Sequence, residues 1–328
     1  MVASMALTPS AGPRPLVSIG LPVYNGERYL EQAIDTILAQ TFQSWELIVS
    51  DNASNDRTEE ICRGYMAREP RIRYHRQERN IGIARNFNAV IDMARADYFK
   101  WHAHDDLCAP TLVERCVEAL EANPTASAAF TKTVRIDAEG ATISDDSYTV
   151  GSVRFAVGSW EDDASYDSPD VVERCLKFLR PGRPAAPAYL FGVMRTNVLR
   201  ATRRHGSFLA ADEVLLLELL LKGPLIQVRE PLFFVRHFSG NATALGLKGD
   251  LVAAQTRLDP RRATRVGSLI SKYQHYWEYL IAVQREQLPP MTKARIEAHI
   301  LGNTLGRARV VTSDVLRGKR TILGRARF

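Results

Sequence analysis

The chain has 328 residues, of which 45% are hydrophobic and 24% charged, and its formal net charge is +6. These proportions are those of an ordinary globular protein with a sizeable core, and no apolar run approaches the roughly 20 residues that a membrane-spanning helix needs. The four cysteines form no Cys-x-x-Cys pair, which argues against a zinc site or a disulfide framework and favours a reduced, cytoplasmic setting.

The positive charge is concentrated towards the C-terminus. Residues 257–328 contain 15 Lys and Arg but only 5 Asp and Glu, a net charge of +10, which leaves −4 for the rest of the chain. Two interpretations stay open: a solvated helical face, or a surface for an anionic partner such as the inner face of a plasma membrane. Residues 1–15, with a single arginine and no sustained apolar run, indicate a disordered leader rather than a signal peptide.

Predicted strands and helices alternate along the first 125 residues. Strand-like runs at 16–21, 45–50, 71–76 and 97–102 are each followed by a helical pattern, and the first strand is expected to break at Pro22. This order predicts an α/β fold: a mixed, mostly parallel sheet with helices on both faces. In such sheets, ligands bind beyond the carboxyl ends of the strands.

The second half of the chain has a looser pattern. We expect a strand at 127–137, a long polar loop at 141–168, a helix at 170–180, a strand at 188–195, an apolar helix at 211–223, one or two strands at 225–238, and helices from 261 onward. The predicted organisation is therefore a leader (1–15), one α/β domain (16–245) with halves 16–125 and 126–245, and a helical, basic C-terminal region (246–328). No Gly-x-Gly-x-x-Gly or Walker A motif occurs.

Candidate ligand-binding residues follow each of the first four predicted strands: Pro22-Val23-Tyr24-Asn25, Asp51-Asn52, Arg79-Asn80 and His104-Asp105-Asp106. The adjacent carboxylates of Asp105 and Asp106 repel each other unless positive charge, water or backbone N–H groups receive them. Such a pair indicates either a helix cap or turn, or a metal ion that carries a phosphorylated ligand.

The segments VSIGLPVYNGERYLEQAIDTILAQTFQSWELIVSDNASNDRTEEI and RNIGIARNFNAVIDMARADYFKWHAHDDLCAP strongly resemble the family 2 glycosyltransferases. The resemblance covers residues 16 to about 120 closely and 185–240 more loosely. It implies a GT-A fold with a Rossmann-type nucleotide-binding domain. It also implies an inverting hexosyltransferase of bacterial cell-envelope glycan biosynthesis, which moves sugar from a UDP-, dTDP- or GDP-sugar to a hydroxyl of a glycan, glycolipid or natural product. The alternative is a non-catalytic nucleotide-sugar-binding protein or scaffold.

The resemblance assigns donor-binding residues by motif position. The loop that walls the base and ribose corresponds to Pro22, Tyr24 and Asn25, and the nucleotide-side loop corresponds to Arg79 and Asn80. Asp51 matches the aspartate that accepts a hydrogen bond from the nucleobase; a local side-chain turn is the alternative for this residue.

The metal-binding motif departs from the family pattern. Where the family commonly has Asp-x-Asp, this chain has Ala103-His104-Asp105, so Asp105 takes the metal position for Mn²⁺ or Mg²⁺. His104 is expected to contact the metal or the donor sugar, or to face solvent, and Asp106 to support the loop or face the sugar. His102 is expected to be packed inside.

The resemblance also places a second metal ligand, or a contact to the diphosphate, at His237, with Arg236 as another candidate for that contact. A structural role for His237 is the competing interpretation.

The resemblance places the general base at the start of a helix in the second half. Asp212 aligns best with that base and Glu213 is the fallback, while an N-cap role for Asp212 is the alternative. Gly192 resembles a glycine on the acceptor side. A lipid-linked acceptor, peripheral membrane contact through the basic region and a homodimer contact are further expected partners; nucleic acid is not.

Overall fold

The computed structural model describes residues 14–143, 147–150, 153–156, 166–180, 187–237, 251–259, 261 and 264–304. Nearly all of the predicted leader, part of the predicted loop at 141–168, and residues 305–328 of the basic region lie outside the described residues.

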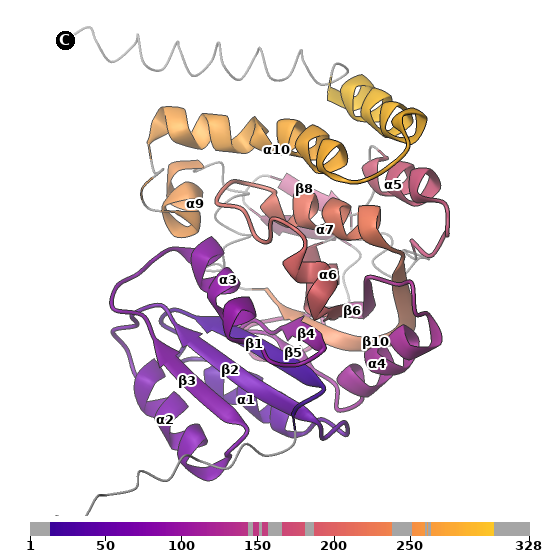
Figure 1. Cartoon of the computed structure of the whole chain (residues 1–328). Helices are drawn as coiled ribbons and strands as arrows, with labels where there is room; N and C mark the ends of the chain where they lie inside the picture. Colours follow the sequence, from indigo (N-terminus) through magenta and orange to yellow (C-terminus); the bar gives the residue numbers. More distant parts are fainter. Residues whose placement is uncertain are drawn as a thin grey trace, which may run out of the picture.

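An eight-stranded sheet forms the centre of the molecule, with the strand order β3-β2-β1-β4-β9-β6-β10-β5 (Figure 1). The strands are β1 Val17–Val23, β2 Trp45–Asp51, β3 Ile72–Arg76, β4 Tyr98–Trp101, β5 Leu107–Cys108, β6 Ala128–Ile136, β9 Val193–Arg195 and β10 Leu225–Arg236. The neighbours from β3 to β4 are parallel, as are β6 and β10, whereas β9 and β5 run antiparallel to their neighbours. The predicted mixed, mostly parallel sheet is confirmed.

Helices cover both faces of this sheet, as predicted. One core contains residues of α1 Leu30–Leu38, α2 Thr58–Arg68 and α4 Leu112–Ala122, and the other contains residues of α3 Ile83–Met93, α5 Val171–Leu179 and α7 Ala211–Lys222. Consecutive residues of β2 show the alternation: Leu47 and Val49 belong to the first core and Ile48 to the second.

The first strand does not break at Pro22, contrary to the prediction. β1 continues to Val23 and keeps its pairing with β2 throughout. The backbone N–H and C=O groups of every second residue of β1, Gly20 and Pro22 included, are on the side of β4. Proline is tolerated at position 22 because the pairing with β4 already ends where Gly20 meets Trp101. The missing N–H of Pro22 therefore faces no strand.

Two other predictions need correction. The predicted loop at 141–168 contains a two-stranded antiparallel sheet, β7 Ser147–Val150 and β8 Val153–Ala156, whose β-branched and aromatic residues flank a Gly-Ser pair typical of a hairpin. The predicted strand at 188–195 is a 3₁₀-helix, η1 Pro187–Phe191, followed by the short β9 and then by α6 Thr196–Arg200.

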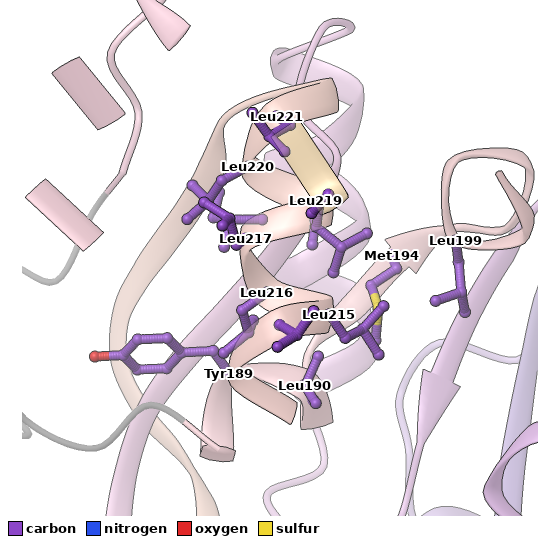
Figure 2. Packing of buried hydrophobic residues seen from close by; sticks show 14 of the residues in the cluster. Tyr189, Leu190, Met194, Leu199, Leu215, Leu216, Leu217, Leu219, Leu220 and Leu221 are labelled. Carbon is purple, nitrogen blue, oxygen red and sulfur yellow. The ribbon is translucent and has the colours of Figure 1, made fainter. Parts of the chain in front are cut away.

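The helix α7 is buried around most of its circumference. Figure 2 shows leucine side chains from successive turns of α7 beside Tyr189, Leu190 and Met194. The helix α9 Leu251–Leu258 lies against α3 and α10. The core is completed by α10 Arg265–Arg285 and a helical segment at 290–304. The last two form the outermost layer at the end of the molecule away from α2 and β3 (Figure 1). Among the described residues, no helix is long and apolar enough to cross a membrane.

Candidate active site

The loops after β1 and β2 are fastened to each other by hydrogen bonds. The backbone N–H of Asn25 donates to Ser54 Oγ (2.9 Å), the N–H of Asn55 donates to Asn25 Oδ1 (3.0 Å), and the N–H of Gly26 donates to Thr58 Oγ1 (2.8 Å). Asn25 has a φ of 53°, a left-handed conformation that Asn tolerates better than most residues. Asn25 therefore shapes the loop after β1, and its neighbour Tyr24 stays 44% exposed.

Asp51 ends β2 as a fully buried carboxylate. Its Oδ1 accepts a hydrogen bond from the Ser54 N–H (2.8 Å), and its Oδ2 accepts from Tyr74 Oη (2.6 Å) and Arg76 Nη1 (2.8 Å). Burial, together with this hydrogen bond, raises the pKa of Tyr74. The turn expected as an alternative role for Asp51 is present, and the contact to a nucleobase stays a prediction.

An amide bridge joins the loop after β2 to the loop after β3. Asn52 Nδ2 donates to Asn80 Oδ1 (3.0 Å), and Asn52 Oδ1 accepts from the Ile81 N–H (2.8 Å). Asn80 Oδ1 also accepts from the N–H of Gly82, where α3 begins, and Arg79 beside it is exposed. The sequence interpretation placed Asn52 directly after a strand but assigned it no role in the site.

The loop after β4 lies against the loop after β1. A Cβ built on Gly26 would approach His104 Cδ2 to 3.1 Å. His104 Nδ1 is 3.9 Å from Asp105 Oδ1, and the two side chains are 28% and 16% exposed. The polar residues that follow all four parallel strands thus gather at one edge of the sheet.

Arg236 supports this loop from the protein side, and its side chain is buried rather than free to reach a diphosphate. The side chain is 1% exposed, and Nε donates to the backbone carbonyl of Asp105 (2.9 Å). The guanidinium also donates to the carbonyls of Asp137 (3.2 Å) and Ala138 (2.9 Å) and to Gln32 Oε1 (2.9 Å). These contacts leave Arg236 directed into the protein.

A group of buried polar side chains lies below Asp105. The carboxylate of Asp106 accepts a hydrogen bond from the Arg236 N–H (2.9 Å), and burial, with the nearby Asp105, raises its pKa well above the usual range. Lys100 Nζ donates to the carbonyls of Trp101 and Phe191 (both 2.9 Å), and burial lowers its pKa. Asp106 therefore has the loop-supporting position that was one of its two expected roles.

His102 is packed inside, as predicted. It is fully buried, and its Nδ1 lies 3.5 Å from Lys100 Nζ. Burial, with the neighbouring Lys100, lowers the pKa of His102 well below its usual value, so the ring is neutral at pH 7.

The residues around Asp105 offer few ligands for a metal ion. The described part of the chain contains no group of three or more His, Cys, Asp or Glu side chains placed to hold one. His237 is near enough to Asp105 for the carboxylate to act on its pKa, but burial and then Arg135 lower that pKa, which favours the neutral imidazole that metals bind. These residues suit an ion that takes its other ligands from diphosphate oxygens, as Mg²⁺ often does.

The two candidate bases occupy the first turn of α7. The residue before the helix is Ala210, which has a φ of 62° and no side-chain cap, so the N-cap role considered for Asp212 is wrong. Asp212 is half-buried, and Glu213 Oε2 accepts a hydrogen bond from Tyr279 Oη (3.1 Å) on α10. Glu213 is thus directed towards the C-terminal helices.

The segment before Asp212 is held from two sides. Asn88 of α3 and His205 exchange hydrogen bonds between the Asn88 amide and the His205 backbone (2.9 and 3.0 Å). From the C-terminal region, Ser271 Oγ accepts from the Leu209 N–H (2.9 Å), and Gln255 Nε2 donates to the Ser207 carbonyl (3.2 Å). The position of Asp212 therefore depends on α3, α9 and α10 together.

The sheet order, the four loops gathered at its carboxyl edge and the acidic residues beyond it define an α/β protein of the GT-A type. Residues 18–156 match the family described as Glycosyl transferase family 2. An uncharacterized glycosyltransferase of Rickettsia typhi is 42% identical over 106 residues, which span 32% of this chain and 32% of that protein. Residues 18–156 therefore resemble a family 2 glycosyltransferase domain, as the sequence predicted, and the matched segment spans only about a third of this relative's length.

Solved structures confirm the predicted fold for nearly the whole chain. TarS 1–349 of S. aureus, solved in complex with UDP-GlcNAc, has a TM-score of 0.62 at 13% identity, over 87% of this chain and 71% of that one. The mannosyltransferase PcManGT from Pyrobaculum calidifontis, in complex with GDP-Man and Mn²⁺, has a TM-score of 0.54 at 16% identity, over 98% and 83%. At these identities the likeness establishes the GT-A fold.

Proposed function

We propose that the protein is an inverting glycosyltransferase that moves a hexose from a nucleotide-sugar to a hydroxyl of a glycan, a lipid-linked glycan or a natural product. The observation that supports this most is the gathering of Tyr24, Asn52, Asn80 and His104-Asp105 at the carboxyl edge of the parallel strands, where α/β sheets bind ligands. A role in bacterial cell-envelope glycan synthesis belongs to the same proposal.

The donor is proposed to be a UDP-, dTDP- or GDP-sugar. Uridine and guanosine nucleotide-sugars are the donors bound by the two solved neighbours, TarS and PcManGT. Tyr24, 44% exposed, is proposed to stack on the base, while Arg79, Asn80 and Pro22 line the nucleotide. Asp51 is proposed to accept a hydrogen bond from the base through the lone pairs that Ser54, Tyr74 and Arg76 leave open.

Asp105 is proposed to hold Mn²⁺ or Mg²⁺, with His237 as a second ligand. The solved PcManGT structure contains Mn²⁺, which supports a divalent ion in this fold. Such an ion, when bound, stabilises the negative charge that grows on the departing nucleoside diphosphate. Arg236 and Asp106 contribute by fixing the loop that presents Asp105 and His104.

Asp212 is proposed as the general base that takes the proton from the acceptor hydroxyl as its oxygen attacks the anomeric carbon. The hydrogen bond from Tyr279 to Glu213 favours Asp212 over its neighbour, because it directs the Glu213 carboxylate to α10. Peripheral contact with the inner face of the membrane is a further proposal, supported by the net charge of +10 in residues 257–328. A homodimer stays a prediction that this charge does not support.

Two substitutions test the roles of donor side and acceptor side. Asp212→Asn should lower transfer by about 10²–10⁴-fold and leave nucleotide-sugar affinity nearly unchanged, because a base acts on the acceptor. Asp105→Ala should weaken both transfer and metal-dependent binding of the nucleoside diphosphate. Transfer is followed by release of nucleoside diphosphate, and affinity by calorimetry across UDP-, dTDP- and GDP-sugars.

Asp97→Asn is a matched control, because Asp97 is exposed at the amino end of β4 and pairs with Arg14. The alternative function is a non-catalytic binding protein, and it is motivated by Ala103, which stands where the family commonly has the first aspartate. Nucleotide-sugar binding by the wild type without any transfer would favour this alternative. Wild-type transfer by Asp212→Asn together with loss in Glu213→Gln would move the base to Glu213.

A further inference from the structure

The helix α10 has two faces with different surroundings. On its inner face, Tyr279, Ala282 and Val283 belong to the same buried core as α7. The hydrogen bonds from Tyr279 to Glu213 and from Leu209 to Ser271 attach this face to the segment that carries Asp212. Whatever binds the other face of α10 is therefore mechanically linked to the acceptor side of the site.

The outer face of α10 exposes large apolar side chains. Ile270 is 56% exposed and Trp277 is 65% exposed. The two residues are seven apart, nearly two helical turns, so they lie on one stripe, and that stripe is opposite the buried residues Tyr279, Ala282 and Val283. A large aromatic residue held out to solvent on a helix that already has a buried face needs a second partner.

The following helical segment, residues 290–304, also exposes large apolar side chains. Met291 is 74% exposed and Leu301 is 48% exposed. Among the described residues, the other large hydrophobic side chains exposed to this degree are Tyr24 and Met66. The exposed apolar groups of the described chain are thus concentrated in the outermost layer of the molecule, which α10 and residues 290–304 form (Figure 1).

Positive charge accompanies the apolar side chains. Arg285 and Arg295 are exposed in the same two helices. Beyond them, the sequence from 305 to 328 contains seven Lys and Arg and a single acidic residue, Asp314. Helices that combine Trp and aliphatic side chains with basic residues bind the headgroup region of membranes that contain anionic lipid.

We propose that the outer surface of α10 and residues 290–304, centred on Ile270, Trp277, Met291 and Leu301, docks onto an anionic membrane surface. Resting on the proposed function, the surface would select acceptors held in that membrane, because the same helix fixes the segment before Asp212. The occupant is the lipid surface rather than a second copy of this chain, since residues 257–328 together have a net charge of +10, which attracts anionic lipid and repels an identical chain.

The test is binding of the full chain to vesicles of phosphatidylcholine with or without phosphatidylglycerol, measured by co-sedimentation at low and high salt. The wild type should bind only the anionic vesicles, and salt should weaken binding. Ile270→Ser/Trp277→Ser should bind about tenfold more weakly, because two apolar side chains no longer enter the interface. Met66→Ser on α2 is the matched control and should bind like the wild type.

Both variants should unfold at the wild-type temperature and bind nucleoside diphosphate normally, since the changed side chains are exposed. Equal sedimentation of the double variant and the wild type would overturn the docking surface. The docking surface would also be overturned if light scattering showed a dimeric wild type and a monomeric double variant while vesicle binding stayed the same, because a second copy of the chain would then cover this face. The two proposals can fail separately. If the wild type transfers no sugar but the double variant still loses vesicle binding, the docking surface is upheld and the proposed activity is not.

Discussion

Asp51 and Asp105, at the carboxyl edge of the sheet, differ in how much of their hydrogen-bonding capacity the protein uses. Asp51 accepts three hydrogen bonds and is fully buried. No described residue donates a hydrogen bond to the carboxylate of Asp105, whose side chain is 16% exposed. The difference leaves more lone pairs of Asp105 available for the proposed metal ion, whereas most of those of Asp51 hold its own loop.

Another buried acid, Glu46 on β2, makes the protein's stability depend on pH. Burial by itself would raise its pKa, but hydrogen bonds from Ser18, Arg95 and Arg73 together lower it below the usual 4.5. A lowered folded-state pKa contributes stability above pH 4.5, and that contribution is lost as the pH falls through the folded-state pKa. Glu46→Gln should therefore lower the free energy of unfolding by about 2 kcal/mol at pH 7.

The pH profile separates this effect from a general loss of packing. In urea unfolding, the difference between Glu46→Gln and the wild type should shrink steadily below pH 4.5, because the wild-type carboxylate also becomes neutral. Glu60→Gln is the control, since Glu60 forms an exposed pair with Arg57. A stability difference that stays constant from pH 7 to pH 3 would show that charge at Glu46 is not the cause.

At the scale of elements, β9 is fixed by the close approach of Gly192 to β6. A Cβ at Gly192 would lie 2.1 Å from the Ala129 carbonyl oxygen and 2.8 Å from Phe130 Cα, both of them backbone atoms. Gly192→Ala should therefore separate β9 from β6 and lower the free energy of unfolding by about 2–3 kcal/mol. It should also disturb the preceding Phe191 carbonyl, which receives a hydrogen bond from buried Lys100.

Gly64 provides the opposite case for comparison. It lies in α2, and a Cβ there would meet nothing within 4 Å. Gly64→Ala should raise the free energy of unfolding by about 0.5–1 kcal/mol, because alanine favours the helix. Thermal unfolding measures the change in stability of each variant relative to the wild type. If Gly192→Ala and Gly64→Ala changed the stability in the same direction, the contact of Gly192 with β6 would not be what determines the fit of β9.

Local patterns predicted those elements whose form depends on their own residues. The spacing of Leu30, Ile34 and Ile37 predicted α1, and the apolar run before Gly223 predicted α7. The form of residues 188–195 was missed because it depends on how Gly192 meets β6. The continuation of β1 through Pro22 was missed because it depends on where the pairing with β4 ends.

In the candidate site, too, the sequence predicted some residues and not the role of others. The motif order identified Asn25, Asp51, Asn80 and Asp105 as residues that follow strands, and the structure gathers them at one edge of the sheet. The role of Arg236 was not predictable, because its partners come from segments as distant in sequence as Gln32 and Asp137. Contacts between such distant segments leave no pattern in the sequence around Arg236.

At the scale of the whole molecule, the C-terminal helices share one core with the sheet. Tyr279, Val283 and Ile300 belong to the same buried cluster as Phe99 of β4 and Val90 of α3. Polar contacts reinforce the union: Lys222 at the end of α7 pairs with Glu286 just beyond α10 (2.6 Å). Residues 14–304 should consequently unfold as one cooperative unit, and the acceptor side should not survive loss of α10.

Arg203 is the main ionic link in this union. Its guanidinium pairs with Glu218 on α7 and with Glu278 on α10, and its Nη2 donates to the Glu278 carbonyl (3.0 Å). The side chains of Glu218 and Glu278 are only 4% and 12% exposed, so Arg203→Ala would leave two carboxylates with little solvent to replace the lost charge. We expect the free energy of unfolding to fall by about 3–5 kcal/mol.

Urea unfolding followed by circular dichroism checks this expectation against Arg115→Ala. Arg115 also contacts two glutamates, Glu118 and Glu230, but all three side chains are about half exposed, so its removal should cost less than about 1 kcal/mol. Arg203→Met/Glu218→Leu should recover part of the loss, because one uncompensated buried charge is then absent. A loss below about 1 kcal/mol for Arg203→Ala, or a separate early transition in the wild type, would mean that the C-terminal helices are joined to the sheet by apolar packing alone.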